Sequence, residues 1–358
     1  MEEADSAVFG PASPLPGPES EVAPGSSASN TKPAPITTHH PGFSHVVLNP
    51  RRIYIQKKGP IVPSAFAHFG TEKPQGGYKS LERLGGASIW VEKDSTELKR
   101  IAAEYTLMRR LDLSEEDFAS LAKEIFLLRA WRSEEASVGR QWRADRMLRL
   151  ACPPDEENWL PPPILDRDAA AAANDDDDDW SWDVRPDCAY WLSLAGFNPD
   201  YLFQVEACTF VRRTATCPYL TVEFERDGQS EDVAVNRVAA AGSLALYGRW
   251  RLHSEARAAA PAPPADDLPN VRHYALTCAG SRFTLWVLRP TARGGRWDGC
   301  TVTKLARADC ADACQAARLA DWINEIHRWG LSEHGPSCGR DIEAILGASG
   351  VRISDVYS

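Results

Sequence analysis

The sequence predicts a mixed α/β domain that follows a helical region and a disordered tail. Apolar residues recur every three or four positions over 95–150 and again over 231–258, which is the period of amphipathic helices. Between and after these stretches lie short runs rich in aromatic and β-branched residues, which are typical of strands. The chain of 358 residues is 43% hydrophobic and 25% charged, so it can bury a sizeable core. Helices, strands, a long helix, further strands and a closing helix together indicate a mixed sheet with helices packed on it.

The first part of the chain divides into a tail and a mainly helical region. Residues 1–45 are rich in Pro, Ser, Gly and Ala with scattered apolar positions, which predicts a disordered tail. Residues 46–165 are expected to be mainly helical. Within them the periodicity predicts helices over 95–111, over 114–131 and from about 134 to 150. Two proline runs then stop the third helix.

The second part is expected to contain the core domain. An Ala- and Asp-rich linker or insert over 166–182 precedes a core over 183–330, and a C-terminal helix and tail occupy 331–358. The expected elements, in chain order, are strands at 188–194 and 219–225, a helix over 231–258, strands at 274–278, 283–288 and about 300–305, and helices around 319–329 and 341–346.

The charge of the chain is unevenly distributed. With 40 basic and 50 acidic residues the formal net charge is −10, which looks unfavourable for nucleic-acid binding. Residues 1–50 and 151–185 together carry −13, however, so the remainder is slightly basic. The net charge therefore does not exclude DNA or RNA as a partner.

The location follows from what the sequence lacks. No run of 18 apolar residues is present, so we expect no membrane span. The acidic, Pro-rich start has neither a basic n-region nor an apolar h-region, so we expect no secretory signal and an intracellular protein of the nucleus or cytoplasm. Nine cysteines, an odd number, then indicate reduced thiols. Cys310 and Cys314, with His327, His334 and Cys338 downstream, suggest zinc, but the spacing and the Ala-rich context favour buried thiols.

Three acidic residues could form a site on two of the expected strands. Asp187 follows a proline where the acidic linker gives way to the first strand, and Glu223 and Glu225 lie on the second. Residues two apart on a strand share a face, so both glutamates point one way and Phe224 and Arg226 the other. If the strands pair, Asp187 and Glu223 come within a few ångströms, and their pKa values rise unless a cation compensates. Mg²⁺ or Mn²⁺ is the natural compensator, and it could polarise a phosphodiester and generate hydroxide.

Three segments carry a resemblance to a known superfamily. They are 184–194 (VRPDCAYWLSL), 217–225 (CPYLTVEFE) and 233–247 (VAVNRVAAAGSLALY). The pattern resembles the PD-(D/E)XK nucleases, whose core reads Pro-Asp, a gap, then Glu-x-Lys on the next strand, and it is most similar to a fungal nuclease-like branch. The resemblance covers roughly 95–330. It implies a restriction-endonuclease-like mixed sheet flanked by helices and Mg²⁺-dependent phosphodiester hydrolysis of nucleic acid.

The resemblance assigns roles to individual residues. Asp187 and Glu223 would be metal ligands, and Glu135 would be the accessory acid that the family places on a helix before the core. Glu225 stands where the family has Lys, whose charge orients water and stabilises the developing phosphate charge. Glu225 could instead be a further metal ligand or a general base. Arg226 cannot readily replace the lysine, because strand alternation points it away.

The long helix would contribute the contacts to nucleic acid. It could present Asn236, Arg237 and Tyr247 near the site, with Arg237 standing where related sequences tend to have Gln. These three residues are therefore our candidates for binding DNA or RNA.

Other interpretations remain open on the sequence alone. Glu223 and Glu225 could lie on the solvated face of an edge strand. The loss of the lysine also allows a catalytically inactive nuclease fold that serves as a binding or protein-interaction module. In a third hypothesis the Asp run over 175–179 mimics a phosphate backbone and occupies the chain's own basic groove. Convergence of the three carboxylates within about 5 Å, close enough to share one cation, would favour the nuclease.

Overall fold

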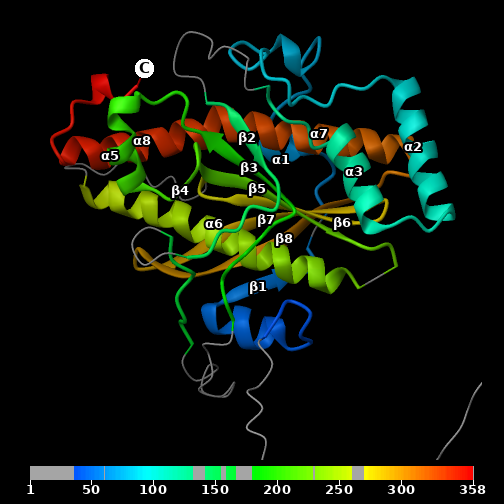
Figure 1. Ribbon diagram of the computed structural model, residues 1–358, viewed down its shortest axis with the longest axis horizontal. Coiled ribbons are helices and arrows are strands. Elements are labelled where there is room, and N and C mark those ends of the chain that lie inside the picture. Colours follow the sequence, from blue (N-terminus) through cyan, green and yellow to red (C-terminus); the bar gives the residue numbers. More distant parts are fainter. Residues whose placement is uncertain are drawn as a thin grey trace, which may run out of the picture. The chain divides into compact units, whose positions relative to one another are not determined.

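A single sheet of eight strands lies at the centre of the fold (Figure 1). The computed structural model describes residues 36–59, 61–131, 142–154, 159–166, 180–228, 230–259 and 270–357. The strands are β1 (Ile53–Gln56), β2 (Ala144–Met147), β3 (Cys188–Ser193), β4 (Val211–Arg212), β5 (Ala215–Glu225), β6 (His273–Ala279), β7 (Arg282–Arg293) and β8 (Arg296–Asp309). Their order is β1-β8-β7-β6-β5-β3-β2, with β4 beside β5. The β1–β8 and β5–β6 pairs are parallel and the other pairs are antiparallel, so the sheet is mixed.

Helices cover both faces of this sheet. They are α1 (Ala65–Phe69), α2 (Ser95–Arg110), α3 (Glu115–Ile125), α5 (Leu202–Cys208), α6 (Glu231–Ala259), α7 (Ala313–Trp329) and α8 (Gly335–Ala348). Helix α6 packs on one face, whereas α2, α3 and α7 pack on the other (Figure 1). Each layer buries its own apolar cluster, and the architecture is therefore α+β with a mixed sheet flanked by helices.

Alternation along the strands decides which side chains meet which helix layer. Val222 and Phe224 of β5 belong to the cluster shared with α2, α3 and α7. Ala189 and Trp191 of β3 belong to the cluster shared with α6. Helix α6 approaches the sheet closely at Gly242, where an added Cβ would lie 2.8 Å from a methyl group of Leu288. The run of small residues in α6 therefore fits it against the middle of the sheet.

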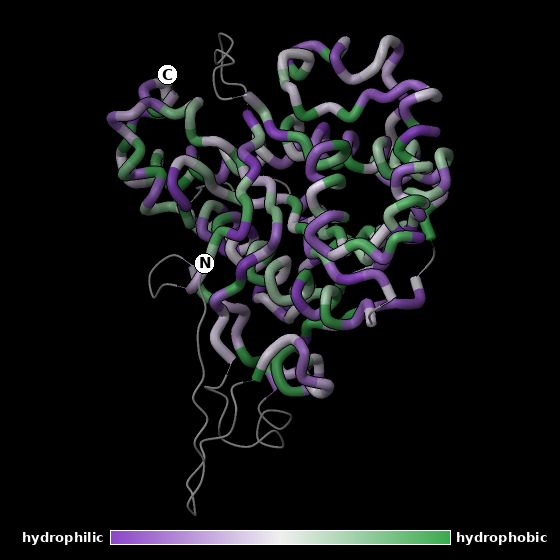
Figure 2. Tube along the Cα trace, turned by 45° about the vertical axis from the view of Figure 1, so that its right-hand side comes forward, coloured by the Kyte–Doolittle hydropathy of each residue, from purple (hydrophilic) through white to green (hydrophobic). Residues whose placement is uncertain are grey.

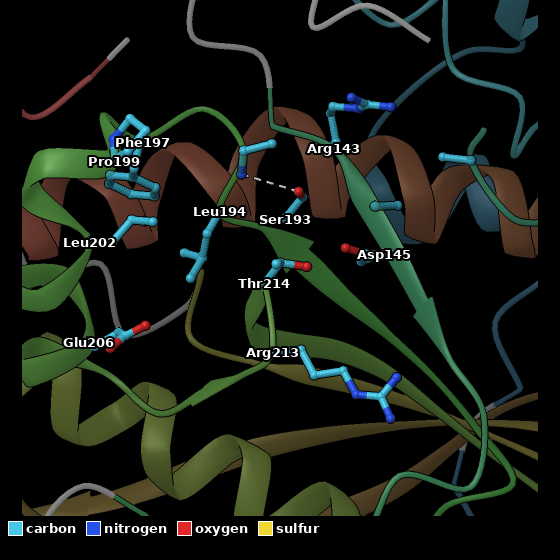
Figure 3. Close-up of a pocket in the computed structure, with 13 residues that line it drawn as sticks. Arg143, Asp145, Ser193, Leu194, Phe197, Pro199, Leu202, Glu206, Arg213 and Thr214 are labelled. Atoms are coloured by element: carbon cyan, nitrogen blue, oxygen red, sulfur yellow. Dashed lines mark hydrogen bonds between the residues drawn. The ribbon is translucent and has the colours of Figure 1, made fainter. Parts of the chain in front are cut away.

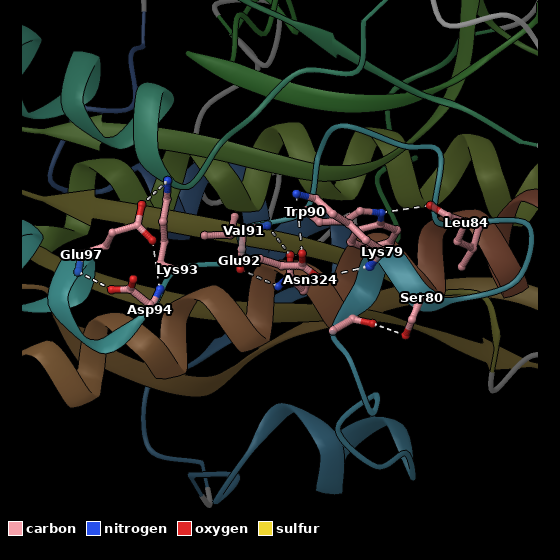
Figure 4. Close-up of polar contacts among 11 residues, drawn as sticks. Lys79, Ser80, Leu84, Trp90, Val91, Glu92, Lys93, Asp94, Glu97 and Asn324 are labelled. Atoms are coloured by element: carbon pink, nitrogen blue, oxygen red, sulfur yellow. Dashed lines mark hydrogen bonds and ion pairs between the residues drawn. The ribbon is translucent and has the colours of Figure 1, made fainter.

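Buried polar contacts attach the chain that leads into α2 to helix α7 (Figure 4). The Asn324 side chain accepts a hydrogen bond from Val91 N (2.8 Å) and donates one to Val91 O (3.0 Å). The Asp94 carboxylate then caps α2, accepting from Glu97 N at 2.8 Å. The loop before α2 thus fixes where this helix begins on the sheet.

Most of the elements expected from periodicity are present in the predicted order. The strands predicted in the second half lie within β3, β5, β6, β7 and β8, and the predicted helices correspond to α2, α3, α6, α7 and α8. Helix α3 ends at Ile125, earlier than expected. Strands β1 and β4 and helices α1 and α5 were not expected, because each is too short for a period to show.

The third predicted helix is wrong over the residues that the structure describes. Ala144–Met147 is strand β2, which pairs antiparallel with β3 through Asp145 and Trp191. Ala144 and Met147 are buried on opposite faces of the sheet. Their spacing of three looks like a helical repeat, but on a strand it places apolar side chains on both faces. Residues 132–141 lie outside the described residues.

The boundary predicted for the tail is also wrong. Residues 1–35 lie outside the described residues, but 36–45 belong to the folded unit, which spans Ile36 to the C-terminus. Phe43 is fully buried in the cluster under α6. The divisions predicted after 165, 182 and 330 all fall inside this unit.

Hydropathy along the chain agrees with this layered packing. Figure 2 shows hydrophobic and hydrophilic positions mixed along the tube, as amphipathic elements require. None of the described helices has the length and apolarity needed to cross a bilayer.

Candidate active site

The pairing of β3 with β5 brings Asp187 and Glu223 together. The two strands are antiparallel, and Cys188 is the partner of Val222, so Asp187 stands opposite Glu223. The Asp187 carboxyl group is close enough to that of Glu223 to raise the pKa of Glu223. Asp187 also accepts a hydrogen bond from the Phe224 backbone N–H at 2.9 Å, which fixes its orientation. A carboxyl pair therefore lies where β3 begins and β5 ends.

Both glutamates are buried rather than solvated. Glu223 is 4% exposed and Glu225 is 5% exposed. Strand β5 lies between β3 and β6, so the alternative of a solvated edge strand is wrong. Burial raises the pKa of Glu223 well above its usual range, the nearby Asp187 raises it further, and Arg237 opposes both effects. The protein alone therefore favours the protonated form of Glu223.

Arg237 is the cation that pairs with Glu225. Its Nη1 lies 3.9 Å from Glu225 Oε2, which has no hydrogen-bond partner among the described residues. Its Nη2 lies 3.1 Å from His39 Nε2. Arg226 points away, as the alternation predicts, and pairs with Asp112 at 3.5 Å. A positive charge is therefore present at the site, but it comes from α6 rather than from the strand.

A fourth carboxyl group reaches the site from α3, and sequence reasoning missed it. Glu115 lines the same cavity as Asp187, Glu223 and Arg237. Burial raises the pKa of Glu115, and the charges of Glu225 and Asp187 raise it further. The acidic group predicted on a preceding helix was Glu135, which lies outside the described residues.

A sequence signal for Glu115 does exist. Ser114 caps α3 through a capping box with Asp117, so the Ser-Glu-Glu-Asp run was interpreted only as a helix start. Because the predicted third helix is replaced by β2, α3 is the last described helix before strands β2 and β3. Recognising β2 as a strand would therefore have moved the choice from Glu135 to Glu115.

Two segments outside the sheet help to enclose the cavity, whose volume is about 390 Å³. Thr38 comes from the N-terminal segment and Trp180 from the chain before β3. The Trp180 ring packs edge-on against Phe43, with centroids 4.8 Å apart. Arg185 also lines the cavity and is paired with Asp183. The carboxyl groups thus lie beneath a cover formed by the chain itself.

The other residues predicted on α6 do not line this cavity. Asn236 binds the N-terminal segment, because its Nδ2 donates to Thr38 O (3.1 Å) and its Oδ1 accepts from Ser44 Oγ (3.0 Å). Tyr247 lies ten residues beyond Arg237, about 15 Å along the helix. Its ring contacts Trp297 at 5.0 Å between centroids. Only Arg237 of the three is therefore placed to contact a substrate here.

The donor set of the site fits a hard cation only in part. Among the described residues, no group of three or more His, Cys, Asp or Glu side chains is arranged to hold a metal ion. The oxygen donors of Asp187 and Glu223 nevertheless suit Mg²⁺, which is commonly bound through one or two carboxylates and retained waters. Such a cation would replace the proton that burial favours on Glu223.

The cysteine and histidine residues that suggested zinc do not form a metal centre. Cys310 is buried, whereas Cys314 is exposed. His334 Nε2 lies 3.7 Å from Cys338 Sγ, but no third ligand joins them in the described part of the chain. The nine cysteines are all free thiols, as predicted.

A second cavity at the β2 edge differs in chemistry (Figure 3). Its volume, about 380 Å³, is similar, but apolar residues such as Leu194 and Phe197 form much of its wall. Its two carboxyl groups, Asp145 and Glu206, lie on opposite sides in Figure 3. Converging carboxyl groups are therefore a property of the first cavity and not of this one.

Comparison with known proteins adds no relative. No protein-family model matches the chain, and neither a curated protein nor a solved structure matches it. The interpretation of the site therefore depends on its residues and geometry. The acidic run at 175–179, for which phosphate mimicry was considered, lies outside the described residues.

Proposed function

We propose that this protein hydrolyses phosphodiester bonds of nucleic acid with a divalent cation, on a PD-(D/E)XK-like, restriction-endonuclease-like core. The observation that carries the proposal is the carboxyl pair of Asp187 and the buried Glu223, which face each other across β3 and β5. A protein gains no stability by placing a second carboxyl group beside a buried one, so the pair supports a functional constraint. The mixed sheet flanked by helices is consistent with this core.

The cation, Mg²⁺ or Mn²⁺, would be held by Asp187 and Glu223. When bound, it would polarise the phosphoryl oxygen and lower the pKa of an attacking water. Asp187 is already oriented by the Phe224 N–H, so one of its oxygens is committed to the backbone. Glu223 must give up its proton, and the positive charge of Arg237 assists that step.

Arg237 would supply the positive charge that the family obtains from lysine. Its guanidinium lies on the cavity wall beside Glu225, where it can donate to a non-bridging phosphate oxygen. Glu225 would then orient the attacking water or accept its proton, since its Oε2 has no other hydrogen-bond partner among the described residues. The exchange of Lys for Glu on the strand is thus offset by an Arg on the facing helix.

Glu115 would act as the accessory acid in place of the predicted Glu135. Burial and the charges of Glu225 and Asp187 raise its pKa, which suits a group that gives a proton to a leaving oxygen. It approaches from α3 rather than from the sheet. The accessory acid and the carboxyl pair would thus enter the cavity from different elements.

A second candidate function is an inactive nuclease fold that binds nucleic acid or protein. It is favoured by the cover of Thr38 and Trp180 over the cavity and by the hydrogen bond between His39 and Arg237. In that case the carboxyl pair would remain protonated and bind no cation.

The experiment compares cleavage by the full chain and by matched variants. Single- and double-stranded DNA and RNA are incubated with the protein and Mg²⁺ or Mn²⁺. We expect cleavage that Asp187→Asn and Glu223→Gln each reduce by about a thousandfold. Glu206→Gln, a matched change in the second cavity, should leave the rate unchanged. Cleavage that survives in both site variants would exclude this site, and no cleavage with either cation would favour the inactive fold.

A further inference from the structure

Two arginines stand opposite each other where β6 begins beside β7. His273 of β6 pairs with Leu288 of β7 in an antiparallel register, so Arg272, one residue before β6, lies across from Arg289. Residues directly opposite each other share a face of the sheet, and like charges in that position are destabilising. Among the described residues neither arginine has an acidic partner. The pair therefore calls for a negative charge from outside the chain.

The surroundings do not neutralise this positive charge. The pKa of His68 in α1 is lowered to about 4 by burial and by the charges of Arg272 and Arg289, so its ring is neutral at pH 7 and adds no negative charge. Glu333, whose charge acts on the same region, pairs with Arg328 at 3.1 Å. The two opposed arginines thus keep an excess of positive charge.

Aromatic rings hold the Arg272 guanidinium in place without using its donors. The guanidinium carbon lies 4.9 Å from the ring centroid of Trp329, 5.4 Å from that of Phe69 and 5.6 Å from that of Tyr274. Its Nε has no hydrogen-bond partner within the described part of the chain. A guanidinium oriented by stacking loses little further freedom when it binds a phosphate group.

The register continues this line across two more strands. Arg289 pairs with Thr301 of β8, and Thr301 pairs with Tyr54 of β1, so all these side chains share one face. Tyr54 is 48% exposed, and Arg289 is exposed as well. Four neighbouring strands span about 14 Å. We call the four residues on this line the arginine row: Arg272, Arg289, Thr301 and Tyr54.

We propose that the arginine row binds single-stranded nucleic acid. The two guanidiniums and the Thr301 hydroxyl would donate to phosphate oxygens, and the Tyr54 ring would stack on a base. A positively charged track beside an exposed aromatic ring is how proteins bind single strands without reading their sequence. A duplex keeps its bases paired inside and would leave Tyr54 without a stacking partner.

This binding surface is separate from the candidate active site. Glu223 pairs with Thr277 of β6, and Arg272 lies five residues before Thr277, about 17 Å along the strand. Thr277 Oγ1 accepts a hydrogen bond from Trp286, which belongs to the cluster under α6, whereas Arg272 packs on the face of α1 and α7. Binding at the row therefore does not depend on the proposed hydrolysis.

The test measures binding with EDTA present, so that no cation-dependent hydrolysis takes place. Fluorescence anisotropy follows a labelled single-stranded DNA oligonucleotide binding to the full chain, and the same sequence is measured as a duplex. We expect the single strand to bind about tenfold more tightly than the duplex. A failure of the proposed hydrolysis would leave this result unchanged, whereas equal affinity for both forms, or no binding, would overturn the proposal.

Substitutions of Arg289 test the electrostatic contact, because this side chain is exposed and the fold does not rely on it. Arg289→Ala should weaken single-strand binding by about tenfold and reduce the slope of log Kd against log salt concentration by about 0.7, as the loss of one phosphate contact requires. Arg289→Lys should keep most of the affinity. Arg100→Ala removes an exposed arginine of α2 and should change nothing. Unchanged affinity in Arg289→Ala would overturn the proposal.

Two further comparisons fix the position and the kind of ligand. Tyr54→Ala should weaken binding by about tenfold without changing the salt slope, and unchanged affinity would overturn the stacking role. Affinity lost in Arg237→Met but kept in Arg289→Ala would place the strand in the candidate active site and overturn the proposal. Tighter binding to vesicles of phosphatidylcholine and phosphatidylserine than to the single strand would assign the row to a lipid surface instead.

Discussion

The two ends of β5 differ in how their buried ionisable groups are stabilised. Every residue of this strand is buried, so ionised side chains on it are costly. Beside Cys217, the buried charge of Arg249 is neutralised within the chain by Asp341, and Ser337 accepts a further hydrogen bond from it. At Glu223 the neighbours are other carboxyl groups, and Arg237 only partly opposes them. The charges at the Cys217 end are neutralised within the chain, whereas the Glu223 end requires a proton or a cation from solution.

The largest expected effect concerns the Cys217 end of β5, where Arg249 is paired with Asp341. Arg249→Met should lower the free energy of unfolding by about 3–5 kcal/mol, because it leaves Asp341 buried beside no guanidinium. Denaturant titration measures the change. The double variant Arg249→Met/Asp341→Leu should recover much of the loss. An Arg249→Met chain as stable as the unmutated protein would show that this end is not held by its internal ion pair.

The matching substitution at the Glu223 end, at Arg237, should reduce the cleavage rate rather than the stability of the fold. Arg237→Met should reduce the proposed cleavage by about a hundredfold, since it removes the cation expected to contact phosphate. Its side chain is 30% exposed and its ion pair with Glu225 is long, so the free energy of unfolding should change by less than about 1 kcal/mol. Arg237→Lys is the control and should retain part of the rate. A large loss of stability would show that Arg237 stabilises the fold in the same way as Arg249.

The dependence of stability on pH sharpens the contrast further. A carboxyl group whose pKa is raised by folding stabilises the folded state below its ordinary pKa, and this stability is lost as pH rises towards the raised value. The pKa of Glu223 is raised, so its own contribution to stability should grow as pH falls from 7 towards 5, whereas the buried His273, His327 and His334, whose pKa values burial lowers, contribute in the opposite sense. The unmutated chain should therefore gain stability relative to Glu223→Gln over this pH range. Equal pH dependence in both proteins, measured by thermal unfolding, would contradict the burial argument.

The smallest effect concerns the cover over the carboxyl end. Asn236→Ala removes two hydrogen bonds to the N-terminal segment and should lower the free energy of unfolding by about 1 kcal/mol. Limited proteolysis around Thr38 should become faster, because the segment is held less firmly. Unchanged proteolysis would show that other contacts hold the cover in place.

Local sequence pattern predicts the side-chain directions on β5, but it does not predict how elements distant in sequence pack together. Strand alternation correctly separated Glu223 and Glu225 from Arg226, because side-chain direction on a strand depends only on the residue's position. The same reasoning failed at Ala144, where a strand that buries both faces imitates a helical repeat. Glu115 was missed as a consequence, because α3 becomes the last helix before β2 and β3 only when β2 is recognised as a strand. Phe43 lies in a stretch rich in turn-forming residues, and only tertiary packing buries it.

The roles of the two arginines depend on contacts distant in sequence. Arg237 is twelve residues beyond Glu225, and Arg249 reaches Asp341 from another helix. No local pattern marks one as the neighbour of Glu225 and the other as the neighbour of Cys217 and Asp341. The left-handed backbone of Cys217 is likewise invisible in sequence, although the proline that follows it is a weak sign of irregularity.

The most direct test of the central claim is calorimetric titration of the full chain with Mn²⁺ at pH 7 in buffers of different ionisation enthalpy. We expect one site whose occupation releases protons, because the cation must displace the proton that burial favours on Glu223. Binding should be lost in Asp187→Asn and in Glu223→Gln and retained in Glu206→Gln. Absence of binding, or binding that is unchanged in both site variants, would contradict the account.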